Sequence, residues 1–225
     1  MFYSLLTPHR FLLLGFIIIV VIGSFLLTLP IASTSGNSQS FIDALFVATS
    51  AVSTTGLTVV DLGSFYSLFG QIVILVLIQI GGLGYMIFVV TIVLQLGGKL
   101  SLGGKLILEE SLSSPPYEEV SRFSKVIIFI TFLFEFLGAA VLSLYWMREF
   151  PAKHAIYLGI FHSVSAFGTV GLSTGVTPAL SVTGKIVLVI TMLIGRVGPL
   201  AIGFSIRGKC KLVPIKYPEG GILVG

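Results

Sequence analysis

The sequence predicts an all-α integral membrane protein, and three observations support this fold class. Hydrophobic residues make up 55% of the 225 residues and charged residues only 10%, whereas soluble domains carry roughly 25% charged residues. The mean hydropathy of +1.08 indicates more apolar surface than water can solvate. Four apolar segments, at 11–29, 72–96, 126–147 and 186–206, have the length of roughly 20 residues that a helix needs to cross a bilayer.

The placement of the basic residues predicts the orientation. Lys and Arg concentrate in the cytoplasmic loops of membrane proteins. Here most of them precede the first apolar segment, separate the second from the third, or follow the fourth. These residues are Arg10, Lys99, Lys105, Arg122, Lys125, Arg207, Lys209, Lys211 and Lys216. We therefore expect a multi-pass protein with both termini in the cytoplasm, in contact with membrane lipid and without a nucleic-acid partner. The single cysteine, Cys210, excludes an intrachain disulfide.

An internal repeat relates the two halves of the chain. Residues 50–58 align with 165–173, and the Gly-Gly pair at 81–82 aligns with Gly195-Arg196. Each half has a long apolar segment, a shorter one, a Thr/Gly/Ser stretch and a second long segment. The shorter segments, at 41–52 and 155–167, suit re-entrant helices because they cannot cross a bilayer. We expect two parallel helix–pore-loop–helix (M1-P-M2) repeats, with four transmembrane helices plus two re-entrant pore helices.

The expected organisation has four parts. They are a first repeat at 1–97, a cytoplasmic linker at 98–122, a second repeat at 123–206 and a cytoplasmic C-terminal tail at 207–225. The linker and the basic tail would face a cytoplasmic partner, or lie as solvated loops near anionic lipid.

The two Thr/Gly/Ser stretches are candidate pore linings. Irregular backbone at membrane depth is tolerated where it is buried in protein or lines a water-filled cavity, and potassium channels select ions with rings of backbone carbonyls in Thr-Val-Gly sequences. Glycine adopts the required dihedral angles without steric strain, and ordinary polar loops between spans are the alternative. The candidate ion-binding residues are Thr54, Thr55, Gly56, Leu57, Thr58, Thr169, Val170, Gly171, Leu172 and Ser173.

Four further side chains have roles that the sequence leaves open. Arg196 is either a pore-facing cation that gates ion passage or a side chain that extends to the membrane interface. Glu135 forms an ion pair with Arg196, forms an interhelical hydrogen bond, or binds a cation. Asp61 attracts cations at the outer mouth or caps a loop. His162 is interpreted as a packing residue rather than a ligand.

Glycines are frequent in the two spans that follow the stretches. Small residues let membrane helices approach closely, so close packing is favoured over a hinge function. The positions are Gly81, Gly82, Gly84, Gly195 and Gly198.

Long sequence motifs carry a family resemblance. They occupy residues 41–46, 53–61, 79–84, 161–167, 168–175, 194–199 and 216–220. With these motifs the chain resembles the Trk/Ktr/HKT superfamily of potassium transporters, and specifically the bacterial Ktr-type membrane (pore) subunit. The resemblance implies potassium uptake across the plasma membrane (the bacterial inner membrane), with filter glycines at Gly56 and Gly171 and sodium symport. It also implies a dimer of pore subunits on a cytoplasmic ring of nucleotide-binding (RCK-type) regulatory subunits.

The chain itself is expected to need no cofactor and not to be an enzyme. The resemblance further implies that it binds transported K⁺ at the filter residues, with Na⁺ as a candidate second ion, and that ATP/ADP or NAD(H) acts only through the regulatory partner. The sequence contains no metal-spaced His/Cys cluster and no catalytic triad that meets outside the membrane.

The chain departs from the family in length, since it has two repeats where the family has four. The second repeat begins like the family's second repeat, up to Phe167, and ends like the fourth, from about Gly168. The family's third repeat, which carries the gating loop, has no counterpart here. A four-sided filter would then need two chains. The alternative function is a non-conducting truncated protein or scaffold that binds the regulatory subunit.

Overall fold

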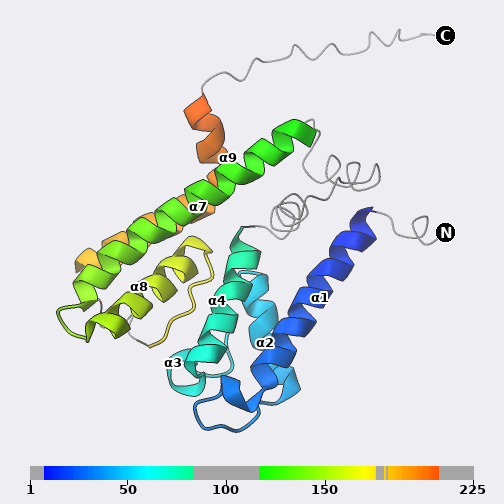
Figure 1. The fold of residues 1–225 in the computed structure, drawn as a ribbon, viewed down its shortest axis with the longest axis vertical. Coiled ribbons are helices and arrows are strands. Elements are labelled where there is room, and N and C mark those ends of the chain that lie inside the picture. Colours follow the sequence, from blue (N-terminus) through cyan, green and yellow to red (C-terminus); the bar gives the residue numbers. More distant parts are fainter. Residues whose placement is uncertain (1–7, 84–116, 176–179, 181, 208–225) are drawn as a thin grey trace, which may run out of the picture.

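The computed structural model describes residues 8–83, 117–175, 180 and 182–207, and these residues form an α-helical structure (Figure 1). The first half contains α1 (Pro8–Thr28), the 3-10 helix η1 (Pro30–Ala32), α2 (Phe41–Val52), α3 (Leu62–Phe65) and α4 (Leu68–Gly82). The second half contains α7 (Tyr117–Trp146), α8 (Ala152–Phe167) and α9 (Val182–Arg207). Within the described part of the chain the extended pairing is limited to one isolated bridge, between Ser33 and Tyr66. The expected all-α fold class is therefore confirmed.

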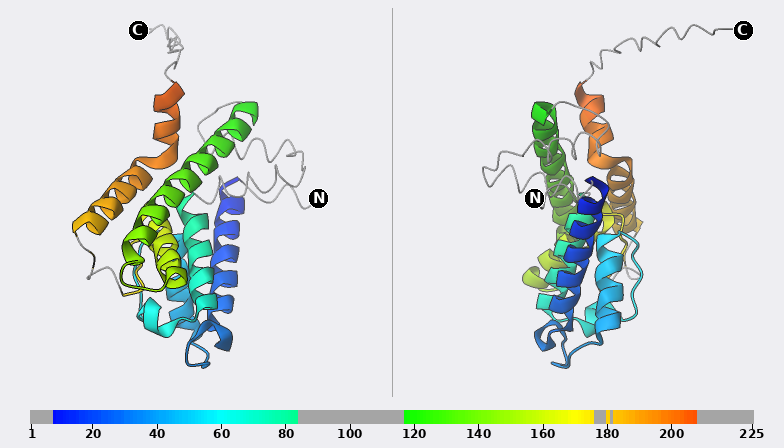
Figure 2. Two further views of the ribbon diagram at one scale, coloured as in Figure 1. Left: turned by 60° about the vertical axis from the view of Figure 1, so that its left-hand side comes forward. Right: turned by 90° about the vertical axis from the view of Figure 1, so that its right-hand side faces the viewer.

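The helices form two groups that follow the two halves of the sequence. In the first group α2 and α4 pack on α1, and in the second α8 and α9 pack on α7 (Figures 1 and 2). The two groups meet where α4 contacts α8. Each group thus places a short helix, α2 or α8, between two longer elements.

The buried core joins the two groups. Its larger cluster contains Leu27 of α1, Val47 of α2 and Ile74 of α4, together with Phe161 and Val170 of the second half. A smaller cluster lies within the second half, around Leu142, Trp146 and Leu158. Because the larger cluster includes residues of the second half, the first half is not an independent core.

The outer faces of the long helices are apolar. Phe25 on α1, Phe136 on α7 and Leu193 on α9 are 60%, 70% and 61% exposed. Among the described residues, Lys125–Trp146 of α7 is long and apolar enough to cross a membrane, with a mean hydropathy of 2.4, and Leu13–Thr28 and Leu68–Gly82 are shorter apolar helices. Exposed apolar surface on this scale fits a lipid environment better than water.

Several predicted boundaries differ from the observed ones. The helix α8 begins at Ala152, three residues before the predicted start, because the carbonyl of the extended N-cap residue Pro151 accepts hydrogen bonds from the His154 and Ala155 N–H groups. The helix α4 begins at Leu68, where the Ser67 hydroxyl accepts a hydrogen bond from the Gly70 N–H. The predicted span at 72–96 is described only up to residue 83, and most of the linker at 98–122, with the tail beyond 207 and Cys210, lies outside the described residues.

Candidate functional site

The two Thr/Gly/Ser stretches, residues 53–58 (the first stretch) and 168–173 (the second stretch), have positive φ angles at the same two aligned positions. Thr54 and Thr169 have positive φ angles of 54° and 55°, and Gly56 and Gly171 have φ of 81° and 72°. A non-glycine residue in this region costs on the order of 1–3 kcal/mol and persists only where its surroundings fix it. The strained and the glycine positions coincide with the repeat alignment, so the sequence repeat is also a conformational repeat.

A serine in the last turn of each short helix holds its stretch in place. The Ser50 hydroxyl accepts a hydrogen bond from the Leu57 N–H at 2.7 Å, and the Ser165 hydroxyl donates to the Leu172 carbonyl at 2.7 Å. Backbone bonds reinforce both turns, because the Ser50 and Ser165 carbonyls accept from the N–H groups five residues later at 2.9 and 3.1 Å. Sequence reasoning missed these two serines as site residues, although the repeat alignment contains both.

The first stretch lies directly against the second. A Cβ on Gly56 would overlap the Val170 carbonyl, and just beyond the ends of the two stretches a Cβ on Gly63 would overlap the Thr174 carbonyl. Two features therefore require glycine at position 56: its positive φ and its close approach to the Val170 carbonyl. Gly171 differs, since its Cβ position faces open space within the described structure.

The glycines of α4 and α9 also allow close packing at equivalent places. A Cβ on Gly81 would overlap the Val52 carbonyl at the end of α2, and a Cβ on Gly195 would overlap the Phe167 carbonyl at the end of α8. A Cβ on Gly82 would lie 3.0 Å from the Gly168 Cα in the second stretch. These contacts support the packing interpretation for these three glycines. The Gly84 and Gly198 environments lie outside the described side chains.

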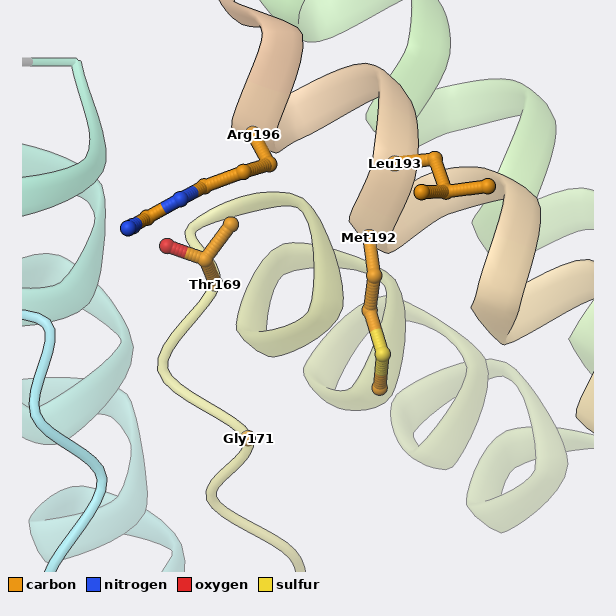
Figure 3. Close-up of a pocket in the computed structure, with 5 residues that line it drawn as sticks. All are labelled: Thr169, Gly171, Met192, Leu193 and Arg196. Carbon is orange, nitrogen blue, oxygen red and sulfur yellow. The ribbon is translucent and has the colours of Figure 1, made fainter.

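Arg196 lies beside the second stretch. Its side chain extends from α9 past Thr169 and toward α4 (Figure 3). Thr169, Gly171, Met192, Leu193 and Arg196 line a pocket of about 390 Å³. The described residues place no carboxylate in an ion pair with Arg196, and its side chain is exposed. Its charge therefore faces the open space next to the second stretch.

Glu135 connects three helices. On α7 its carboxylate accepts a hydrogen bond from the Gln79 amide of α4 at 3.2 Å, and its backbone carbonyl accepts one from the Ser163 hydroxyl of α8 at 2.7 Å. Its side chain is only 5% exposed. Of the roles considered for this residue, the geometry matches the interhelical hydrogen bond.

A second polar contact joins the halves at the start of α4. The Gln71 amide of α4 donates to the Tyr66 carbonyl at 2.8 Å, and its oxygen accepts a hydrogen bond from the Tyr157 hydroxyl of α8. The Tyr66 hydroxyl donates to Gln39 at 2.5 Å, and burial raises the pKa of Tyr66 to about 12. Gln71 therefore ties the start of α4 to α8.

Asp61 and His162 have local partners. The Asp61 carboxylate caps α3, because it accepts hydrogen bonds from the Ser64 N–H at 3.2 Å and the Ser64 hydroxyl at 2.6 Å. It remains exposed, so a role at the outer mouth stays a prediction. His162 is buried against Trp146 and lies 3.3 Å from the Ser173 hydroxyl. It therefore packs under the second stretch and also contacts one of its residues.

The two stretches contain only uncharged groups that could bind an ion. Their side chains are hydroxyls and aliphatic groups, and their carbonyls supply further oxygens. Within the described residues no group of three or more His, Cys, Asp or Glu side chains is placed to hold a metal ion. Such oxygens suit weak, reversible coordination of a monovalent cation.

A comparison with protein families identifies the class of protein. The family model described as "Cation transport protein" (TrkH) matches residues 7–156 and 151–209. The chain therefore belongs to the TrkH family of cation transport proteins. This family consists of membrane transporters of the cell membrane and not of enzymes, which confirms the predicted class.

Named relatives are similar along most of the chain. Ktr system potassium uptake protein B of Bacillus subtilis (strain 168) is 39% identical over 202 residues, which cover 89% of this chain and 44% of that protein. The potassium/sodium uptake protein NtpJ of Enterococcus hirae is 39% identical over 74% of this chain and 37% of its own length. Ktr system potassium uptake protein B of Vibrio alginolyticus is 38% identical over 73% of this chain and 36% of its own. The chain thus spans less than half the length of these relatives, which agrees with the predicted shortening.

Proposed function

We propose that this chain takes up potassium across the plasma membrane as a pore-forming subunit, with the two stretches as strands of its selectivity filter. The main support is the matched pair of backbones, with positive φ at Thr54 and Gly56 and again at Thr169 and Gly171. The contact of Gly56 with the Val170 carbonyl brings the two strands side by side. The names of relatives as potassium and potassium/sodium uptake proteins agree with this proposal.

The proposed selectivity depends on backbone oxygens. A dehydrated cation needs its water oxygens replaced, and carbonyls along both stretches supply them without a fixed negative charge. The C-terminal ends of α2 and α8 precede the stretches directly. Because a helix carries partial negative charge at its C-terminus, both helices would stabilise a cation in this position.

The proposed topology has two M1-P-M2 units. In this arrangement α1, α4, α7 and α9 cross the membrane, α2 and α8 are re-entrant pore helices, and both termini are cytoplasmic. Arg196 would then lie on the cytoplasmic side of the filter and face the ion path, where its charge slows cation passage.

The proposed partners are a second copy of this chain and a ring of cytoplasmic RCK-type regulatory subunits. Relatives called "Ktr system" proteins imply systems of several components. Nucleotides such as ATP/ADP or NAD(H) would act through the regulatory ring, and Na⁺ would be a coupling ion. The linker and tail that would contact this ring lie outside the described residues.

Uptake in a bacterial strain that lacks its own potassium transporters tests the function. We expect growth at low potassium and rubidium uptake when the chain is expressed with a Ktr-type regulatory subunit. Gly171→Ala should abolish uptake, because it disturbs a filter strand. Gly36→Ala is the matched control, since Gly36 has nearly the same φ of 71° and open space around it but lies in an outer loop. Absence of uptake by the unmodified chain, despite membrane insertion, would refute the proposal.

A second candidate is a non-conducting scaffold that binds the regulatory subunit. In this alternative the two-repeat chain inserts in the membrane but does not conduct. Co-purification with the regulatory subunit without any rubidium uptake would support the scaffold over the pore.

A further inference from the structure

Two glycines of the first half lie against the second stretch. On the first half, Gly56 meets the Val170 carbonyl and Gly82 meets the Gly168 Cα. Each contact therefore pairs a glycine of the first half with the second stretch. In the second half the equivalent positions are Gly171 and Arg196.

The equivalent face of the second half is open. The Cβ position of Gly171 has no atom within 4 Å in the described structure, whereas that of Gly56 is fully occupied. Arg196, at the position of Gly82, is exposed and lines the pocket beside Gly171 (Figure 3). The backbone around both residues resembles that around their counterparts. Gly171 has a φ of 72° against 81° at Gly56, and Gly195, next to Arg196, packs on α8 as Gly81 packs on α2. The face is thus shaped for a filter strand that the second half does not itself supply.

From this geometry we infer that the open face binds the first stretch of a second copy of this chain, an inference that rests on the proposed function. The repeat alignment gives the register of the contact. Thr55 is the equivalent of Val170 and Ser53 is the equivalent of Gly168. Gly171 therefore abuts the Thr55 carbonyl of the second copy, and Arg196 abuts its Ser53.

The same contact repeats on the opposite side of the assembly. The second copy presents its own Gly171 and Arg196 to the first stretch of the first copy, so a two-fold axis relates the two interfaces and the ring closes. The filter then alternates first and second stretches, and two Arg196 side chains lie at the two junctions between copies. The contact between the first half and the second stretch within one chain therefore has the same geometry as the proposed contact between two chains.

Cysteine cross-linking tests the register. In a Cys210→Ser background, one chain carries Ser53→Cys and a differently tagged chain carries Arg196→Cys. The internal template places the Gly82 Cβ position 3.0 Å from the Gly168 Cα, so the equivalent cysteines fall within the separation that a disulfide spans. Co-expression should give an oxidised product of twice the mass that reductant removes. The matched control replaces Arg196→Cys with Ile190→Cys, an exposed position on another face of α9, and should give no such product.

A chain that carries both cysteines tests closure. A two-copy ring gives a covalent dimer and nothing larger, whereas an open head-to-tail contact gives a ladder of higher masses. A ladder would overturn the closed ring. Absence of the mixed product, with both variants inserted in the membrane, would overturn the interface and leave the face to lipid or to another chain.

The cross-linking experiment can fail without the proposed potassium uptake failing, and the reverse also holds. Cross-linking of the cysteine variants, with no rubidium uptake by the unmodified chain, would retain the interface and refute the pore. Rubidium uptake by the unmodified chain, with no cross-linking of the variants, would retain the pore and refute the interface. The unmodified protein, chemically cross-linked in membranes, provides an independent measurement of the dimer if either cysteine variant fails to insert.

Discussion

Gln79 and Glu135, from the two halves of the chain, share a hydrogen bond between the Gln79 amide nitrogen and a carboxylate oxygen of Glu135 at 3.2 Å. The Glu135 carbonyl also accepts from Ser163 on α8, and α8 leads directly into the second stretch. Glu135 therefore fixes α4 of one half relative to α8 of the other. Because Gly82 on α4 touches Gly168, this hydrogen bond helps to set the spacing between the two halves at the candidate filter.

Replacement of Glu135 separates a hydrogen-bonding role from a cation site. Glu135→Gln can still pair with Gln79, so we expect unchanged uptake and thermal stability. Glu135→Leu leaves the half-buried Gln79 amide without this partner and should destabilise the protein by about 1 kcal/mol, the order found for interhelical hydrogen bonds in membranes. Thermal unfolding in detergent and rubidium uptake measure both effects. Loss of uptake in Glu135→Gln would instead show that the charge is required.

Ser50 is predicted to hold the first stretch in its conductive shape. Ser50→Ala removes the acceptor of the Leu57 N–H, a loss of about 1 kcal/mol. We expect the ratio of potassium to sodium uptake to fall, because the strand can relax. Ser24→Ala is the control, since the Ser24 hydroxyl is also buried but donates within α1 to Val20. An equal change of selectivity in both variants would contradict the anchoring role.

Gly56 of the first stretch and the loop glycine Gly36 should respond differently to alanine in a stability measurement. Gly56→Ala adds an overlap with the Val170 carbonyl to the strain of a positive φ, whereas Gly36→Ala adds only the strain. The strain alone costs roughly 1–2 kcal/mol. We therefore expect a clearly lower melting temperature in detergent for Gly56→Ala than for Gly36→Ala. Equal melting temperatures would mean that the two stretches are not in contact.

Removal of the Arg196 charge should raise the rate of uptake. Its side chain lies beside Thr169 and faces open space, so its charge repels a cation that leaves the second stretch. We expect faster rubidium uptake for Arg196→Gln and a rate near that of the unmodified protein for Arg196→Lys. A decrease in Arg196→Gln would indicate a structural role.

The raised pKa of Tyr66 should make the folded protein less stable at alkaline pH. Burial raises its pKa to about 12 in the folded protein, against about 10 in an unfolded chain. Between these values the folded state holds a proton that the unfolded state has released, so stability falls as the pH rises from 10 to 12. Tyr66→Phe should show a smaller fall over this range in unfolding experiments. An identical pH dependence in both proteins would contradict the assignment.

Much of the candidate site could be predicted because the sequence encodes it locally. Gly56 and Gly171 were predicted from a Thr-x-Gly pattern, and both lie at positive φ. The serine anchors were missed because a hydroxyl in an apolar helix gives no sign of its partner. The roles of Glu135 and Asp61 were left open for the same reason, and their partners, Gln79 and Ser64, became known only from the packed helices.

The sequence by itself determined the all-α membrane class, the two-fold repeat and the glycines of the two stretches, because hydropathy and backbone freedom are properties of short segments. Only the tertiary structure decided that Gly56 is covered by the Val170 carbonyl while Gly171 faces open space. The repeat alignment treats these two glycines as equal. Their difference depends on which neighbour each half meets, and such contacts between distant segments arise only when the helices pack.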